Sequence, residues 1–244
     1  MELNNPPCSI PVSAPLYGEP PYLYRGGNSL ICVFRTEARA VEALVPEPLK
    51  ANPDGLVYGW QNDFHVVGLG SYHEAIVSIP VEFRGKLGQY LAYLYLDSDV
   101  PIAAGREIFG FPKKFGRFSL SDKENVLTRV VERGGVDLFR LSVQCTAPGK
   151  EADLAALANP LYNLKIIPSV RKGAPPDVMQ LTAMTLQNVV VHRVLEGSAT
   201  VKFGESPADP LFKLQPIEVL KALYCELDFD LPHGEVVHEY PKVR

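Results

Sequence analysis

Two adjacent lysines have the setting in this chain most suited to covalent chemistry. Lys113 and Lys114 directly follow Pro112 in the segment GREIFGFPKKFG, which is otherwise rich in aromatic residues and glycine. Burying an unpaired ammonium among apolar side chains costs several kcal/mol or forces the group to lose its proton. A lysine that has lost its proton is a nucleophile, so this segment predicts an amine that attacks a carbonyl carbon.

The size of the required pKa shift indicates the environment that such an amine needs. A free lysine has a pKa of about 10.4, so a neutral amine near pH 7 requires about 4 kcal/mol of destabilisation of the ammonium. Repulsion from one solvated ammonium at ~4 Å supplies only about 1 kcal/mol. Desolvation must supply most of the remainder. If Lys113 and Lys114 lie in extended backbone, their side chains leave on opposite faces, so only one of them can be the nucleophile.

Length and composition limit the number of domains, the partners and the cellular location that we expect. The 244 residues suffice for one large domain with a hydrophobic core or for two small ones. A net charge of −4 with interspersed signs argues against nucleic acid as a partner. We expect a cytoplasmic protein without a membrane segment, because the start MELNNPPCSIPVS is unlike a signal peptide and no apolar run could span a bilayer. The scattered cysteines, which fit a reduced compartment, are Cys8, Cys32, Cys145 and Cys225.

The hydrophobic pattern predicts a mainly β protein with antiparallel pairing and few helices. Short apolar, β-branched segments bounded by turn residues recur along the chain. We expect strands near 29–35, 56–61, 71–83, 89–96, 126–131, 138–145, 178–194, 199–203 and 223–230. Short helices are expected at 37–45, 150–158 and 217–223, with an extended N-terminal arm over 1–21 and a loop at 172–177.

The lysine segment resembles the corresponding motif of the acetoacetate decarboxylase family, in which a lysine is activated by an apolar pocket or a cationic neighbour. Other segments fall in the same order and at nearly the same separations, so the resemblance covers most of the chain. They are FRTEARAVEALVPEPL at 34–49, GLGSYHEAIVSIPVEF at 68–83, YLYLDSD at 93–99 and NLKIIP at 163–168. The resemblance implies one domain over 1–244 with an antiparallel, cone-shaped or barrel-like β fold and a few peripheral helices. It also implies a homo-oligomer that uses neither an organic cofactor nor a metal.

The resemblance assigns roles to three charged residues. Lys113 matches the lysine that forms a Schiff base with the substrate, and Lys114 matches its companion. Lys114 could tune Lys113, or it could reach solvent or hold a carboxylate. Glu74, in Tyr72-His73-Glu74, matches a glutamate that faces the reacting centre and could transfer protons as a general acid or base.

Two positions depart from the family pattern. This chain has Gly27 where the decarboxylases have an arginine, and Gly59 where they have a glutamate. Arg25 stands two residues before Gly27 and is a candidate to bind the substrate in place of that arginine. Gln61 stands two residues after Gly59 and would share its face of a strand, so it is a second candidate.

Two aromatic residues are weaker candidates for lining the substrate pocket. Phe109 belongs to the lysine segment, and Tyr240 lies in a segment that resembles the family's tail. For Arg106 and Glu107, which adjoin the lysine segment, we expect a structural role as an ion pair or a backbone clamp.

Other catalytic and metal-binding patterns find little support. His65 and His73, or His233 and His238, lack both the spacing and the third ligand of a metal site. Asp97 and Asp99 are more simply a turn after a strand than a metal clamp. The sequence contains neither GxSxG nor a P-loop, which argues against a serine hydrolase and an NTPase.

Three functions remain open on the sequence. The first is decarboxylation of a small β-keto acid through a Schiff base on Lys113. The second uses the same lysine to condense pyruvate with an aldehyde and dehydrate the aldol, or to run the reverse; the departures at Gly27 and Gly59 make this plausible. The third is a β-barrel that binds small apolar ligands and has lost the chemistry.

Overall fold

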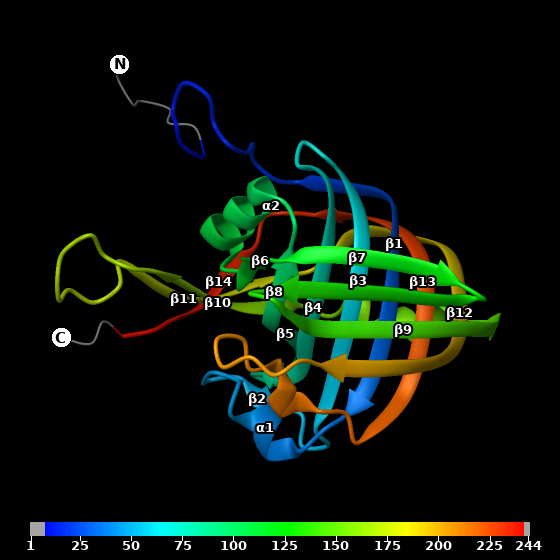
Figure 1. Ribbon diagram of the computed structural model, residues 1–244. Helices are drawn as coiled ribbons and strands as arrows, with labels where there is room; N and C mark the ends of the chain where they lie inside the picture. The colour runs from blue at the N-terminus through cyan, green and yellow to red at the C-terminus, as the bar shows by residue number, and fades with distance from the viewer. Residues whose placement is uncertain (1–7, 242–244) are drawn as a thin grey trace.

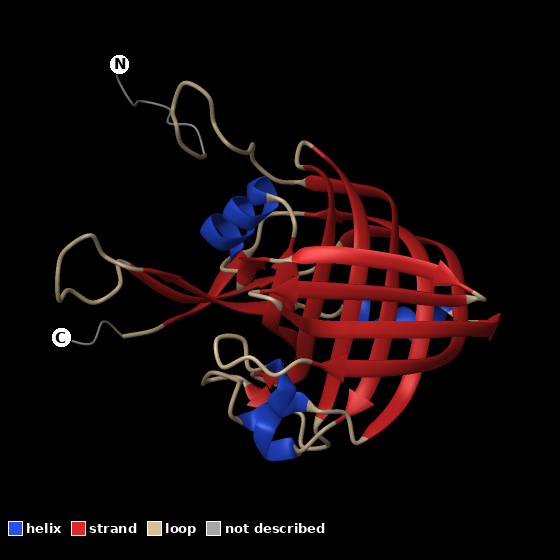
Figure 2. Ribbon diagram, in the orientation of Figure 1, coloured by secondary structure: helices blue, strands red, loops and turns tan. Residues whose placement is uncertain are grey.

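The computed structural model describes residues 8–241, and it shows one extensive, strongly curved β-sheet with a few short helices at its margins (Figures 1 and 2). The hydrogen-bonded order of the main path is β14-β11-β10-β5-β4-β3-β1-β13-β12-β9-β8-β7, so the sheet is not closed. Pairing is antiparallel except where β10 and β6 each run parallel to β5. The expected mainly β, barrel-like fold is confirmed.

The elements follow one another along the chain in mostly antiparallel succession. The strands are β1 (Tyr22–Arg35), β2 (Lys50–Ala51), β3 (Leu56–Val67), β4 (Gly70–Phe83), β5 (Lys86–Leu96), β6 (Lys113–Phe115), β7 (Arg117–Lys123), β8 (Val126–Arg133), β9 (Val136–Pro148), β10 (Leu161–Ile167), β11 (Val178–Met184), β12 (Gln187–Phe203), β13 (Glu218–Leu231) and β14 (Glu235–Glu239). The helical elements are α1 (Ala38–Glu42), α2 (Asp99–Ala104), the π-helical turn η1 (Gly105–Phe109), and the 3₁₀ turns η2 (Glu151–Ala158) and η3 (Leu211–Leu214).

The central strands are buried on both faces, and each face packs into its own hydrophobic core. In β1, Leu30 and Phe34 enter the first core, which also holds Phe139, whereas Ile31 enters the second. Successive residues of a strand point to opposite faces, which explains why neighbouring residues are separated in this way. The second core, which contains Phe64 and Phe111, surrounds the functional site.

The lysine segment reaches the sheet through a sharp turn. Helix α2 continues into η1, which ends at Gly110 with a φ of 80°, a conformation that glycine adopts without steric cost. A Cβ on Gly110 would also lie 2.6 Å from Cα of Lys165 in β10, so the close approach itself requires glycine. The chain then enters β6, which pairs with the end of β5.

Several expected elements differ from those observed. The helix expected at 217–223 is wrong, because these residues belong to β13, which pairs with β1 on one side and β12 on the other. The strand expected at 178–194 is two strands, β11 and β12, and the helix expected at 150–158 is the 3₁₀ turn η2. Of the expected arm over 1–21, residues 8–21 are irregular; residues 1–7 lie outside the described part of the chain.

Candidate active site

A cavity of about 100 Å³ lies in the second core, between β3, β4, β5 and β13. Its walls are almost wholly apolar, and a cavity of about 150 Å³ with such walls accepts a benzene molecule. This cavity is smaller than that one, so it has room for a molecule of a few heavy atoms. Its apolar lining includes Trp60, Phe64, Ile76, Leu91, Leu94, Phe111, Leu157, Leu161, Leu186, Leu227, Phe229 and Leu231.

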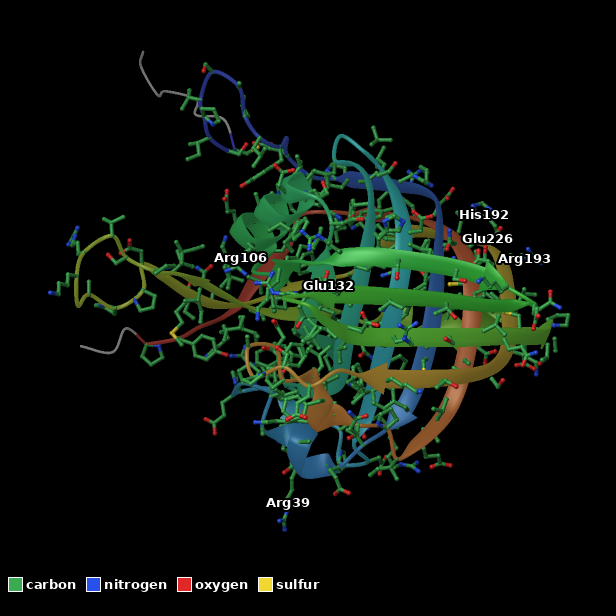
Figure 3. All side chains as sticks on the ribbon, in the orientation of Figure 1. Arg39, Arg106, Glu132, His192, Arg193 and Glu226 are labelled. Atoms are coloured by element: carbon green, nitrogen blue, oxygen red, sulfur yellow. The ribbon has the colours of Figure 1, made fainter. Side chains whose placement is uncertain are left out.

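Lys113 enters this cavity from β6, and its backbone is held from three sides. The residue pairs with Leu94 of β5, its N–H donates to the carbonyl of Phe111 at 2.8 Å, and its own carbonyl accepts from Arg106 Nη1 at 3.1 Å. Figure 3 labels Arg106 near the junction of α2 and β6. Arg106 therefore clamps the backbone of Lys113, which is the structural role expected for it.

The lysine amine meets one buried carboxylate. Nζ of Lys113 lies 3.1 Å from Oε2 of Glu74 in β4, and the two residues are 4% and 5% exposed. Oε2 has no aligned hydrogen-bond donor within the described residues, so the contact is an ion pair without the geometry of a good hydrogen bond. The ring centroids of Phe111 and Tyr72 lie 5.3 and 5.6 Å from Nζ, so two aromatic rings flank the amine.

A pair of phenols borders the cavity beside this ion pair. The hydroxyl groups of Tyr24 and Tyr72 are 2.9 Å apart, and both residues are buried. Burial is the main cause that raises the pKa of both phenols, and the nearby Glu74 raises each further. Both are therefore neutral hydrogen-bonding groups at physiological pH.

The comparison with known proteins now identifies the family. The family model described as acetoacetate decarboxylase (ADC) matches residues 9–241. The chain belongs to the acetoacetate decarboxylase family. Curated relatives agree: an acetoacetate decarboxylase of Ralstonia nicotianae is 33% identical over 95% of this chain and 94% of its own length, and acetoacetate decarboxylase 2 of Mesorhizobium japonicum is 31% identical over 95% and 89%. Membership identifies the chain as a carbon–carbon lyase.

Solved structures show the same fold. A structure described as acetoacetate decarboxylase superposes with a TM-score of 0.90 at 29% identity over 96% of both chains. The acetoacetate decarboxylase of Legionella pneumophila gives 0.88 at 26% identity over 95% and 94%. The enduracididine biosynthesis enzyme MppR, solved in complex with pyruvate, gives 0.83 at 18% identity over 96% and 98%, which shows a shared fold alone.

Lys114, which we expected to be the companion of the reactive lysine, lies outside the cavity. Nζ of Lys114 forms an ion pair of 2.6 Å with Asp209, and the Lys114 side chain is 40% exposed. Lys113 and Lys114 thus leave β6 on opposite faces, as extended backbone dictates. The buried Asp209 also accepts from the hydroxyl of Tyr95 at 3.0 Å and lies 3.3 Å from Arg133. Lys114 is therefore part of a structural ion-pair cluster.

The two residues expected to compensate for the glycines also lie outside the cavity. Arg25 donates to Asp230 at 2.6 Å and to the carbonyls of Tyr24 and Phe229, so its guanidinium is held at the surface. Gln61 is buried on the other face of β3, where Nε2 donates to the carbonyl of Phe139 at 3.1 Å.

Side chains at Gly59 and Gly27 would contact different parts of the protein. A Cβ on Gly59 would lie 2.9 Å from the ring of Phe139 in the first core, so Gly59 faces away from Lys113. Gln61 shares that face as expected, yet that face is not the cavity's. A Cβ on Gly27 would lie 3.1 Å from Phe64, which does line the cavity. Only the departure at Gly27 thus changes the neighbourhood of the site.

The two aromatic candidates and His73 do not line the cavity. Phe109 is buried behind the cavity wall, with its ring stacked 5.1 Å from that of Phe111. Tyr240 donates to the carbonyl of Glu47, away from the cavity. His73 points outward from β4 and bonds Asp97 at 2.7 Å. In residues 8–241, His, Cys, Asp and Glu side chains nowhere gather as a group of three that could hold a metal ion.

The helices of residues 8–241 include none with the length and apolar character needed to cross a membrane.

Asn62 is a polar cavity residue that the sequence analysis missed. Asn62 of β3 is buried and lines the cavity, directly opposite Glu74 in the pairing of β3 with β4. The expected strand ended at residue 61, one residue before it. Extending the alternation of β3 through Trp60 and Phe64 would have placed Asn62 on the cavity face.

Proposed function

We propose that this chain decarboxylates a small 3-oxo acid through a Schiff base on Lys113. The observation that carries the proposal is the buried Lys113–Glu74 pair, which opens onto an apolar cavity of the size of a small organic molecule. The curated relatives named acetoacetate decarboxylase support the choice of acetoacetate or a close analogue as the substrate.

The first step produces the neutral amine. Glu74 lies close enough to Nζ to accept a proton from the ammonium, and the apolar walls favour this neutralisation because they stabilise neither charge. Nζ of Lys113 then attacks the keto carbon of the substrate, which forms a carbon–nitrogen bond. The keto oxygen leaves as water with one proton from Nζ and the proton that Glu74 had accepted, and Lys113 is left as a positively charged iminium.

The second step uses the iminium as the acceptor of electrons. The bond between the carboxyl carbon and C2 breaks, CO2 leaves, and the bonding electron pair moves through C2 to the iminium nitrogen. The product on the enzyme is a neutral enamine. One proton is taken up from solvent in each turnover, and Glu74, once it is reprotonated, is placed to deliver that proton to C2. Water then hydrolyses the resulting iminium, which releases a methyl ketone and restores the lysine.

The test combines product detection with trapping of the intermediate. The wild-type protein should release CO2 from acetoacetate, and borohydride added during turnover should leave a mass increment on the peptide that contains Lys113. Lys113→Ala should lose both, whereas Lys114→Ala should keep the increment. CO2 release by Lys113→Ala equal to the wild type would contradict the proposal. A conjugated enone absorbance with pyruvate and an aldehyde, without CO2 from acetoacetate, would instead assign the condensation and dehydration reaction.

We propose in addition that the chain forms a homo-oligomer. The sheet extension formed by β10, β11 and β14 projects from the body of the protein (Figures 1 and 2) and exposes apolar side chains, among them Ile166, Val170 and Val236. Exposed apolar patches on such an extension are typical of contacts between subunits. Light scattering should give a mass above the 26.9 kDa of one chain; a monomer at micromolar concentration would contradict this proposal.

A further inference from the structure

Three polar side chains form a row across the apolar wall of the cavity. Ser29 of β1 lies directly opposite Asn62 of β3, and Asn62 lies directly opposite Glu74 of β4. Directly opposed residues of antiparallel strands point to the same face, so all three face the cavity that they line. Two positions along from Asn62 in either direction, the wall is aromatic, with Trp60 and Phe64. These three residues form a narrow polar band; two further polar residues of the lining, Ser78 and Gln89, bond to each other at 3.2 Å.

Asn62 is the member of this band that has no partner. Its side-chain Oδ1 and Nδ2 are both buried without a hydrogen bond to any of residues 8–241, and the residue is 4% exposed. Buried amides in proteins are nearly always hydrogen-bonded, because an unpaired buried polar group is destabilising. An unpaired carboxamide that faces a cavity is therefore poised to bond a molecule inside it.

The charges of the cavity indicate which group that molecule presents. Lys113 and Glu74 are the charged residues of the lining, and they are paired with each other. The nearby guanidinium of Arg25 is bound to Asp230 instead. A 3-oxo acid that reacts with Lys113 brings a carboxylate two carbons away from the attacked carbon. Within the polar band, Nδ2 of Asn62 is the donor that is buried without a partner among residues 8–241, so it can receive that carboxylate.

We propose that Asn62 is the substrate-binding residue that holds the carboxylate of the 3-oxo acid, through an uncharged amide where a cation would otherwise serve. The proposal rests on the decarboxylase function proposed above. The substituent on the other side of the keto carbon then lies along the apolar wall that begins at Trp60 and Ile76. The substrate class is accordingly a 3-oxo acid whose remote end is apolar and uncharged.

A neutral donor suits the reaction for an energetic reason. During decarboxylation the negative charge leaves the carboxylate and moves toward the iminium nitrogen. An interaction that holds the carboxylate strongly in the ground state and loses strength in the transition state raises the barrier. A neutral amide orients the carboxylate with less stabilisation of the ground state than a guanidinium gives in a bidentate ion pair.

The test separates the carboxylate from the carbonyl of the substrate. Asn62→Leu removes both hydrogen-bonding atoms and keeps a similar volume, and Asn62→Ser keeps one donor should the leucine variant fold poorly. Asn28→Leu makes the same change one residue before Ser29, on the face of β1 opposite the cavity, which also carries Leu30, where Asn28 contacts Asp63 at 3.5 Å. Two quantities are measured: kcat and KM for CO2 release from acetoacetate, and the rate of borohydride trapping with acetone, which lacks a carboxylate.

We expect Asn62→Leu to raise KM for acetoacetate roughly ten- to a hundredfold, the worth of a hydrogen bond to a charged group, with a smaller rise for Asn62→Ser. Trapping with acetone should change less than about twofold, and Asn28→Leu should match the wild type in both assays. An unchanged KM, or an equal loss in both assays, overturns the assignment of Asn62 while the wild-type release of CO2 leaves the decarboxylase function intact. A wild-type protein that releases no CO2 overturns both.

Discussion

The amine of Lys113 and the carboxylate of Glu74 lie 3.1 Å apart on strands that are separated by β5. The side chains therefore meet across a neighbouring strand, within the second core, where water has little access. Each charge is desolvated, and their separation is short enough for direct proton transfer. The proposed chemistry depends on this relationship more than on any other pair of residues.

Replacement of the carboxylate by an amide tests its part in proton transfer. Glu74→Gln keeps the shape of the side chain but cannot accept a proton from Lys113 or return one to the enamine. We expect kcat to fall about 10²- to 10⁴-fold, the usual worth of a general acid or base. Borohydride should still trap the lysine adduct, because the nucleophile is unchanged. A kcat within threefold of the wild type would show that Glu74 transfers no proton in a slow step.

The fit between Gly105 and Lys113 gives a second prediction. A Cβ on Gly105 would lie 2.6 and 2.7 Å from Cδ and Cε of Lys113, so Gly105→Ala must displace the lysine side chain. That chain is flexible, and we expect the melting temperature to change little. A displacement of about 1 Å at a reacting group can cost about a hundredfold in rate. Turnover and borohydride trapping should thus both fall at least tenfold; unchanged trapping would show that the lysine adapts without penalty.

The features of the site that could be predicted from the sequence are those that depend on local backbone geometry. Extended backbone predicts that the side chains of Lys113 and Lys114 point in opposite directions. The structure shows this arrangement, because Lys113 contacts Glu74 and Lys114 contacts Asp209. The direction of Arg25 was not predictable, because the pairing of β1 shifts register between Tyr24 and Gly27 and the alternation of faces breaks there.

Other differences arise from contacts between distant residues. Residues 217–223 follow Pro216 and fit a first helical turn, yet pairing with β1 and β12 makes them a strand. The sequence analysis did not identify Asn62, because a single asparagine does not indicate a binding site until the strands that flank it are known. Its position opposite Glu74 depends on the register of β3 with β4, which the sequence alone does not specify.

Lys114 should matter to stability more than to catalysis. It is half-exposed and shares Asp209 with Arg133 and the hydroxyl of Tyr95. We expect Lys114→Met to lower the free energy of unfolding by about 1 kcal/mol or less, because the pair is partly solvated and Arg133 remains. Asp209→Ala should cost about 1 to 3 kcal/mol, because it leaves the buried hydroxyl of Tyr95 without its acceptor, whereas the two half-exposed cations can be solvated. Denaturant unfolding measures both, and kcat/KM of Lys114→Met should stay within about threefold of the wild type.

A large loss of borohydride trapping in folded Lys114→Met would contradict this assignment. It would show that the second lysine tunes the first through the sheet. Lys123→Met is a suitable control, because it removes an exposed lysine from β7, beyond the ion-pair cluster around Asp209.

The acid sensitivity of the fold should depend on Asp230. Hydrogen bonds from Asn188 and Arg25 lower the pKa of this carboxyl, so the folded protein binds its proton less readily than the unfolded chain does. The resulting stabilisation is present above the unfolded pKa of about 3.9 and is lost as the pH falls through the lower folded pKa. Asp230→Asn should therefore lower the melting temperature at about pH 6 and reduce the further drop between about pH 5 and pH 3. If the melting temperatures of the two proteins fall equally with pH across that range, Asp230 contributes nothing to the acid sensitivity of the fold.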